Sequence, residues 1–326
     1  LYTGQTTNMI VQRSVPYITG FTAAYDNVGK VTNKGVEFTV NTININGNGK
    51  DSFRWESNLV FDSNANKLVE LFGPDHDGNE ADDITNATTY GYDSYVCLQV
   101  GRPIGAGYDY KLLGVFQSQD EIDNYKSSDG TVIMPNAKPG DYKFEDYNND
   151  GKIDANDRHY VGSPDPLFTL NFGNTLSWKN FSLYFNFRWA QGDKNHFLWC
   201  NPNGHQSNFG SGAQLADSKP WTEKNHSTTV ARYGYQNTLG YNFWENRSFL
   251  KLKDLSFSYT FDQNFIKKVG LSNARVYVAA TDLFTITKWS GLDPENGGTI
   301  ASNSASDKYG SNGTYKTVTF GVNLTF

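Results

Sequence analysis

Residues 315–326 read YKTVTFGVNLTF and alternate between two kinds of side chain. From residue 317 on, the even positions are apolar and the odd positions are small or polar. The apolar set is Val318, Phe320, Val322, Leu324 and Phe326. Because neighbouring side chains of a β-strand point to opposite sides, this pattern predicts a strand with one apolar face and one polar face. A strand of this kind that ends on an aromatic residue is typical of bacterial outer-membrane β-barrels, in which one face meets lipid.

The composition suits a β-rich exported protein. Aromatic residues make up 15% of the 326 residues, yet hydrophobic residues reach only 37%. A run of about 18 apolar residues, which a membrane-spanning helix needs, does not occur. Both a membrane barrel and a large secreted β-sandwich share this composition. The net charge of -6 and the lack of a basic cluster argue against a nucleic-acid partner.

Two further segments, 168–178 and 181–190, alternate as regularly as the last strand. Only Lys179 and Asn180 separate them, and a two-residue link predicts a tight antiparallel hairpin. The remaining strands are expected at about 1–15, 34–47, 51–66, 92–100, 106–117, 247–261 and 273–287. With the last strand these segments make ten. The alternation changes phase near Asp254, which either a β-bulge or a strand that extends beyond the lipid would explain.

The lengths of the connections favour a barrel over a sandwich. Long connections at about 67–91, 118–166, 192–246 and 288–313 alternate with short turns. Transmembrane barrels place their short turns in the periplasm and their long loops outside the cell. We therefore predict an all-β fold, a transmembrane antiparallel β-barrel, with these four loops extracellular and the C-terminus in the periplasm. The chain opens without Met and without a signal peptide, so we expect it to be the C-terminal part of a longer polypeptide.

One loop matches the twelve-residue pattern of a calcium site. It begins at residue 146 and places oxygen-bearing residues at alternate positions, with Gly151 at the sharp turn. The predicted ligands are the side chains of Asp146, Asn148, Asp150, Asp154 and Asp157 and the carbonyl of Lys152. The last position carries the shorter Asp157 where a Glu is usual, which lowers the expected coordination number. The alternative is a turn whose Asp and Asn side chains bind their own backbone without a metal.

Other candidate sites rest on residue type alone. The loop at 192–246 contains several aromatic residues, whose side chains could either stack on a ligand or pack together as a small core of the loop itself. The candidates for ligand contact are Trp199, Trp221, Tyr233 and Tyr235. Cys97 and Cys200 are equally consistent with free thiols and with a bridge. The sequence contains no recognised catalytic or nucleotide-binding motif, so an enzyme is not expected.

Several ordered motifs resemble one family. Residues 146–166 read DYNNDGKIDANDRHYVGSPDP, residues 33–38 read NKGVEF, and residues 249–256 read FLKLKDLS. GRPIG at 101–105, followed by GVFQ at 114–117, and TDLFT at 281–285 also fit. Together these motifs resemble the SusC/RagA family of TonB-dependent outer-membrane transporters of Bacteroidetes.

The resemblance implies a larger protein than this chain. Its barrel would have 22 strands, of which this chain would supply about the last ten, and its plug and TonB-interacting segment would lie elsewhere. The implied activity is TonB-dependent import of oligosaccharides or peptides across the outer membrane. The implied partners are a SusD-like lipoprotein, TonB, the ligand and outer-membrane lipid. The remaining alternative from the residues alone is a secreted calcium-binding adhesion or carbohydrate-binding β-protein.

Overall fold

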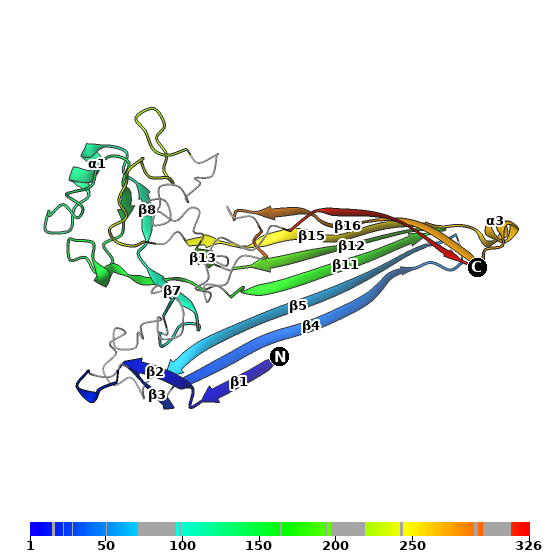
Figure 1. The fold of residues 1–326 in the computed structure, drawn as a ribbon, viewed down its shortest axis with the longest axis horizontal. Coiled ribbons are helices and arrows are strands. Elements are labelled where there is room, and N and C mark those ends of the chain that lie inside the picture. The colour runs from blue at the N-terminus through cyan, green and yellow to red at the C-terminus, as the bar shows by residue number, and fades with distance from the viewer. Residues whose placement is uncertain are drawn as a thin grey trace.

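The computed structural model describes residues 1–14, 17–21, 23–27, 29–49, 51–70, 96–97, 99–163, 165–192, 194–196, 219–241, 244–289, 293–295 and 314–326. In this described part the largest element is an antiparallel sheet of eight strands (Figure 1). From edge to edge the strands are β1 (Tyr2–Thr7), β4 (Lys30–Asn46), β5 (Phe53–Glu70), β11 (Phe168–Trp178), β12 (Phe181–Gln191), β15 (Phe249–Thr260), β16 (Asn273–Thr287) and β17 (Thr317–Thr325). The sheet confirms the prediction of an all-β antiparallel fold.

The β11–β12 hairpin has the register that its alternation predicts. Trp178 pairs with Phe181 across the turn, and the pairing continues without a break to the far ends of both strands. Lys179 adopts a positive φ of 54°, the left-handed conformation that two-residue hairpin turns use. The register therefore follows from local sequence, because a slip by one residue would move every apolar side chain to the other face.

Strand β15 contains a bulge, one of the two explanations for the change of phase near Asp254. Two consecutive residues of β12 pair with Leu252 and Asp254, so Lys253 is an extra residue in the strand. Strand β16 is irregular at the same level, where Asp282 takes a positive φ of 52°. Because of the bulge, the apolar side chains before and after it lie on the same face of the sheet.

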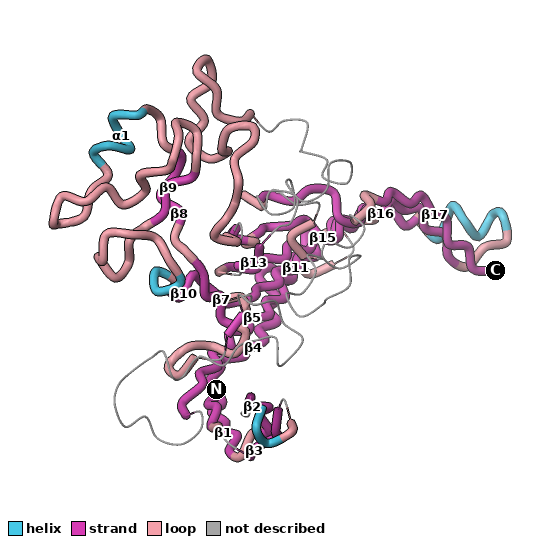
Figure 2. Tube along the Cα trace, turned by 60° about the vertical axis from the view of Figure 1, so that its left-hand side comes forward, coloured by secondary structure: helices cyan, strands magenta, loops and turns pink. Residues whose placement is uncertain are grey.

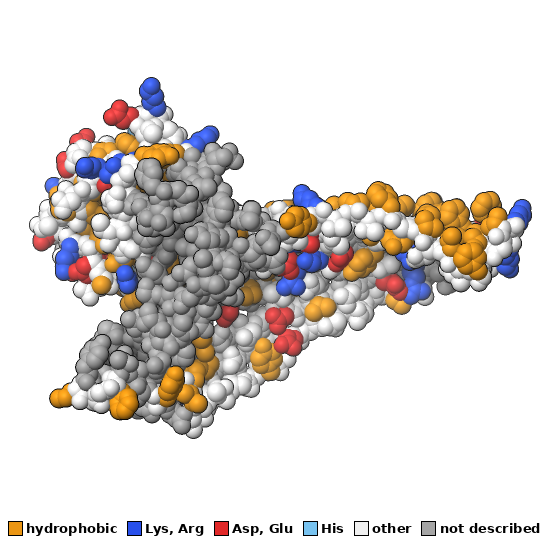
Figure 3. All heavy atoms as spheres, in the orientation of Figure 1, with side chains coloured by type: hydrophobic (Ala, Val, Ile, Leu, Met, Phe, Trp, Pro, Cys, Tyr) orange, Lys and Arg blue, Asp and Glu red, His pale blue; other side chains and the backbone are white. Residues whose placement is uncertain are grey.

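The sheet has one apolar and one polar face, since residues directly opposite each other in a ladder share a face. One row of paired residues crosses six strands on the apolar face: Phe38, Phe61, Leu170, Trp189, Leu250 and Ile286. A row on the other face is Thr39, Val60, Asn171, Arg188, Lys251 and Thr285. Phe38 and Ile286 are 43% and 62% exposed, so the apolar face is not covered by another layer of this chain at these positions. Figure 3 shows hydrophobic side chains running along the strands.

Short and long connections lie at opposite ends of the sheet (Figure 1). The short turns span 47–52, 179–180 and 261–272, and they lie at the same end as the C-terminus. The long connections between sheet strands span 8–29, 71–167, 192–248 and 288–316. Short and long connections therefore alternate along the sheet, but the loops expected separately at 67–91 and 118–166 belong to one connection, and β5 runs to Glu70, into the first of them.

The expected count of ten strands in one sheet is wrong. The segments expected at 92–100 and 106–117 form β6 (Val96–Cys97), β7 (Ala106–Asp109) and β8 (Leu112–Val115), which pair outside the main sheet. The first expected strand, 1–15, is divided into β1 and β2 (Ile10–Ser14). Taking two strands out of the sheet does not change the end at which each remaining connection lies. The short turns therefore lie at the end that was predicted for them.

The smaller elements lie in the connections. The small sheets pair β2 with β3 (Ala23–Asn27), β7 with β6 and β10 (His159–Gly162), β8 with β9 (Tyr142–Phe144), and β13 (Lys194–His196) with β14 (Trp244–Asn246). The helical elements are α1 (Gln119–Asn124), α3 (Gln263–Ile266), and 3-10 turns at Tyr17–Thr19, Ala155–Asp157 and Lys267–Val269. In the described residues, none of the helices has the length and apolar character needed to cross a membrane.

Candidate functional site

Two long connections fold together into a unit that we call the loop layer, residues 106–160 and 219–246. Figure 2 shows this unit gathered at the end of the sheet that lies away from the C-terminus. Its buried core draws on both connections and is mostly aromatic. The core residues are Tyr110, Val115, Tyr142, Phe144, Ala231, Tyr235 and Tyr241. The loop layer therefore has a hydrophobic core of its own, separate from the faces of the sheet.

Polar contacts join the two halves of the loop layer. The Arg232 side chain donates from Nε to Asp141 Oδ1 at 2.8 Å, and its backbone amide donates to the Gly140 carbonyl at 2.7 Å. Gly140 has a φ of +92°, and a Cβ at this position would lie 2.5 Å from the Trp221 ring and 2.6 Å from Arg232 Cβ. The close approach of the two connections therefore requires glycine here.

In the first half of the predicted calcium loop, Asp and Asn side chains bind amides of the same loop. Asp146 accepts hydrogen bonds from the amides of Asp150 and Gly151, at 3.1 and 2.9 Å. The side-chain oxygen Oδ1 of Asn148 also accepts from the Asp150 backbone amide at 3.0 Å, and its side-chain Nδ2 donates to Asp150 Oδ2 at 3.1 Å. These contacts match the alternative of a turn whose Asp and Asn side chains bind their own backbone, and the calcium ion stays a prediction.

The second half of the loop is arranged differently. Asp157 is fully buried and accepts from the backbone amides of Asp154 at 2.7 Å and Tyr147 at 2.9 Å. Burial raises the pKa of the Asp157 carboxyl, and the backbone hydrogen bonds offset only part of this effect. The carboxylate of Asp154 lies 2.5 Å from the Lys152 ammonium, which lowers the Asp154 pKa. Asp157 therefore holds the loop closed through backbone groups.

Calcium fits the oxygen donors of this loop in part. Asp146, Asn148 and Asp150 carry the hard oxygen ligands that calcium prefers, but these side chains, like those of Asp154 and Asp157, already have partners within the chain. Within the described residues, no three His, Cys, Asp or Glu side chains come together as a metal-binding group. A calcium ion would be held by the first half of the loop and by backbone carbonyls such as that of Lys152.

The candidate ligand-contact aromatics divide into two groups. Tyr235 belongs to the loop-layer core, and burial raises the pKa of its hydroxyl. Trp221 packs against the same core and donates from Nε1 to Gln117 Oε1 at 3.2 Å. Tyr233 is 77% exposed and remains available at the surface. Trp199 lies outside the described residues.

The two cysteines are not brought into relation by the described part of the structure. Cys97 lies in β6, which pairs with β7. Cys200 lies outside the described residues, so free thiols and a bridge both stay open for the two cysteines.

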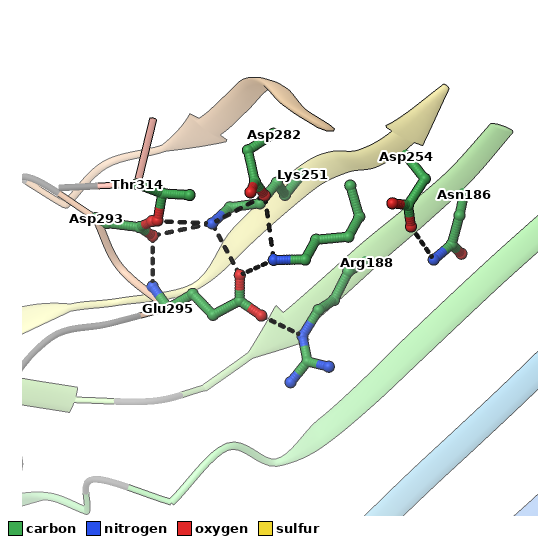
Figure 4. A network of polar contacts seen from close by, with 9 residues as sticks. Asn186, Arg188, Lys251, Asp254, Asp282, Asp293, Glu295 and Thr314 are labelled. Atoms are coloured by element: carbon green, nitrogen blue, oxygen red, sulfur yellow. Dashed lines mark hydrogen bonds and ion pairs between the residues drawn. The ribbon is translucent and has the colours of Figure 1, made fainter. Parts of the chain in front are cut away.

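A charged group on the polar face of the sheet was not predicted. We call it the polar-face charge cluster: Arg188 of β12, Lys251 and Lys253 of β15, Asp282 of β16, and Asp293 and Glu295 of the last long connection. Figure 4 shows these carboxylates turned toward the Lys251 ammonium. The side chain of Lys251 is only 1% exposed, and its Nζ lies 3.0 Å from Asp293 Oδ1 and 2.8 Å from Glu295 Oε2.

The cluster is balanced, with three cationic and three anionic side chains. The Lys253 ammonium lies 3.1 Å from Asp282 and 3.2 Å from Glu295, and Arg188 Nε lies 3.0 Å from Glu295 Oε1. Thr314 also donates to Asp293. Burial raises the pKa of Glu295, but the hydrogen bonds and charges of the two lysines outweigh it and lower the pKa overall. The cluster therefore ties residues 293–295, and with them Thr314 just before β17, to the wall of the sheet.

Sequence reasoning missed this cluster because its members are distant in sequence. Lys251 is separated from Asp293 and Glu295 by 42 and 44 residues. The available signal was the change of phase near Asp254 together with charged residues in a strand that is otherwise apolar on one face. A bulge in a β-sheet re-aims neighbouring side chains, and here it brings a second lysine to the cluster.

Comparisons with known proteins give a consistent result. No family model matches the chain. Two receptors of Formosa agariphila, TonB-dependent receptor P3 and TonB-dependent receptor P26, are each 31% identical over all of this chain and 32% of their own length. TonB-dependent receptor SusC of Bacteroides thetaiotaomicron is 24% identical over 90% of the chain and 27% of its own length. The chain thus spans about a third of the length of the curated relatives that it matches most fully.

The fold comparison agrees with the sequence comparison. A solved structure of the RagAB peptide importer in its open-open state matches 99% of this chain and 32% of the solved chain, with a TM-score of 0.67 and 24% identity. A second structure, of the RagAB peptide transporter, gives a TM-score of 0.68. The eight-stranded sheet, with one apolar face and its long connections at one end, is therefore part of a transmembrane β-barrel. With relatives of this kind along its whole length, the chain belongs to the SusC/RagA family of TonB-dependent outer-membrane transporters.

Proposed function

We propose that the chain is the C-terminal barrel portion of an outer-membrane importer that uses TonB to take up oligosaccharides or peptides. The observation that carries this proposal is the 31% identity to TonB-dependent receptors along the whole chain. The two-faced sheet supports it, since a lipid-facing wall and a polar interior are what an import barrel needs. The comparison also favours the barrel over a secreted β-protein, and we propose no catalytic role.

The proposed orientation places the loop layer outside the cell and the C-terminus in the periplasm. It rests on the separation of short and long connections between the two ends of the sheet. In this orientation the loop layer would form part of the seat of a SusD-like lipoprotein. TonB would act through regions of the full protein outside this chain. Exposed Tyr233 is the loop-layer residue that we propose for ligand contact.

Uptake by cells that produce the full-length protein tests the function. Removal of the protein should abolish growth on one class of ligand, either a glycan or a peptide mixture, and removal of TonB should have the same effect. Growth that survives on both classes in the absence of the protein would overturn the proposal. The class that is lost would also identify the ligand.

We propose a structural calcium ion in the loop that starts at Asp146. The support is the convergence of Asp146, Asn148 and Asp150 around one turn. The double variant Asp146→Ala/Asp150→Ala of the full-length protein should lose calcium-dependent protection of the 118–166 region from protease. Asp129→Ala is a matched control, because Asp129 caps a similar exposed turn by accepting from the Thr131 amide at 2.9 Å. Equal calcium-dependent protection from protease in both variants would show that no calcium ion is bound by Asp146 and Asp150.

A further inference from the structure

The longest of the short turns, residues 261–272, differs from the other two because it contains helical structure, α3 and a 3-10 turn. Asp262 caps α3 by accepting from the Asn264 amide at 3.0 Å, and Gly270 ends the following 3-10 turn with a φ of 79°. Ser272 donates its amide to the Thr325 carbonyl at 2.7 Å, which fastens the turn to the end of β17. Ile266 is buried beneath it. The turn is therefore held in one shape at the end of the barrel wall.

This turn presents apolar side chains to the outside although it has a buried residue of its own. Phe265 and Val269 are 63% and 67% exposed. Phe265 lies in α3 and Val269 ends the 3-10 turn that follows it, so both side chains belong to the same short connection. A connection surrounded only by water gains nothing from exposing two large apolar side chains so fully.

The exposed side chains continue the apolar face of the barrel. Phe257 and Tyr259 lie on that face of β15, Phe261 comes directly after the strand, and the centre of its ring lies 5.1 Å from that of Tyr259. The ring of Phe265 stacks on that of Phe261, with a centroid distance of 6.3 Å. The aromatic row of the lipid-facing wall thus runs without a gap onto the turn.

The charges of this end of the barrel are mostly positive. Lys267 and Lys268 are exposed beside Val269, and the neighbouring turn contributes Lys179, whose ammonium lies 5.0 Å from the centre of the Trp178 ring. Figure 3 shows basic side chains at this tip, next to hydrophobic ones. Within 261–272 the one acidic side chain is the capping Asp262. A basic patch beside inserted aromatics is the pattern of segments that lie in the headgroup layer of a membrane.

We propose that the 261–272 turn is an interfacial anchor: Phe265 and Val269 insert into the edge of the lipid leaflet, and Lys267 and Lys268 bind phosphate groups of its phospholipids. The occupant is lipid because the turn extends the lipid-facing wall and its cations complement phospholipid phosphate. The anchor would fix the height of this end of the barrel in the membrane.

Depth-dependent fluorescence quenching in vesicles tests the anchor. The full-length protein, in a background without other cysteines, is labelled at Val269→Cys, at Gln263→Cys or at Val322→Cys. Gln263 is the matched control because it lies two residues from Phe265, on the opposite side of the helix. Val322, 63% exposed on the apolar face of β17, reports insertion of the barrel itself.

The Val269 label should be quenched by lipids that carry bromine near the headgroups, and the Gln263 label should be quenched less. Adding phosphatidylglycerol to phosphatidylcholine vesicles should shift the emission of the Val269 label. In Lys267→Gln/Lys268→Gln the ratio of surface-bound to free turn should fall about 30-fold on these anionic vesicles, since each lysine near such a surface contributes about a fivefold change.

The controls separate the possible failures. A quenched Val322 label with equal, weak quenching at positions 263 and 269 would overturn the anchor and leave the barrel intact. That result would leave a periplasmic protein as the occupant of the turn. An unquenched Val322 label would overturn the barrel assignment and the anchor together.

Discussion

Replacing Lys251 by Met should release residues 293–295 from the barrel wall. Lys251 is the centre of the polar-face charge cluster, and its side chain is 1% exposed. Met has nearly the same length and fills the space, so the substitution removes the charge with little change of volume. The Asp293 side chain, 6% exposed, would then keep a buried negative charge without its cation.

The size of the effect follows from this burial. Removing one partner of a buried ion pair costs about 3–5 kcal/mol, because the remaining charge stays out of water. Glu295 is 19% exposed and keeps Lys253 and Arg188, so the loss falls at the lower end, about 3 kcal/mol. At 1.4 kcal/mol for each factor of ten, the segment should open about a hundredfold more often.

Amide hydrogen exchange of the full-length protein measures this opening. The reporter is the Glu295 amide, which donates to Asp293 Oδ1 at 2.9 Å. Its protection should fall about a hundredfold in Lys251→Met, or to the unprotected rate if that is reached first. Heat-modifiable mobility on gels, unchanged in the variant, would show that the barrel still folds.

The matched control is the same substitution at an exposed ion pair. Lys111 and Glu145 approach to 2.7 Å with side chains that are 53% and 30% exposed. Such pairs contribute about 0.2–1 kcal/mol, so Lys111→Met should change the protection of the Glu145 amide less than about fivefold. Adding Asp293→Asn to Lys251→Met should restore protection, since the unpaired carboxylate is gone. Equal, small effects at Lys251 and Lys111 would refute the reasoning.

Three further predictions concern the loop layer. Gly140→Ala should destabilise it by about 1–3 kcal/mol more than Gly130→Ala, because both glycines have a positive φ but only Gly140 meets other side chains; equal protease sensitivity of the two variants would contradict this. Asp157→Ala should cost about 1–3 kcal/mol by leaving buried backbone amides unpaired. Burial raises the pKa of the Asp157 carboxyl, so the stability lost in Asp157→Ala should be largest below the ordinary aspartate pKa and should shrink as the pH rises through the folded-state pKa. A loss of stability that grows with pH would contradict this. Tyr233→Ala should weaken ligand uptake with the loop layer intact, whereas Tyr235→Ala should loosen the layer, as near-UV circular dichroism would show; unchanged uptake in Tyr233→Ala would remove it from the ligand path.

The parts of the fold that were predictable are those encoded by neighbouring residues. The β11–β12 register followed from alternation and a two-residue link, and a change of phase at Asp254 indicated the bulge in β15 as one of two explanations. Both signals are local, because strand periodicity and hairpin geometry involve residues that are close in sequence.

The number of barrel strands was not predictable in the same way. Alternation indicates a half-buried strand, but it does not say what covers the buried side. In 106–117 the covering partners are Tyr142 and Phe144 of the loop layer, and not lipid. The strands β7 and β8 are also only four residues long, which is too short to cross the hydrocarbon core.

The candidate site was predictable in residue type and only partly in geometry. Oxygen spacing located the turn around Asp146, but the buried role of Asp157 depends on the amides that it meets after folding. Likewise, Trp221 and Tyr235 could not be distinguished from Tyr233 before the second connection was placed against the first. The polar-face charge cluster depends on contacts across more than 40 residues, which single-sequence patterns do not report.

The bulge in β15 has a consequence for how the length of this strand can change in evolution. Without Lys253, Leu252 and Asp254 would be adjacent, and the alternation of the strand would run unbroken with the same side chains on each face. The ladder with β16 would then call for the loss of residues 282–283 as well, which removes Asp282. Insertions and deletions at these two places should therefore occur together among relatives. Chains that lack the extra residues should still keep the acidic pair at 293 and 295, because losing Lys253 and Asp282 removes one cation and one anion and leaves buried Lys251 in need of its partners.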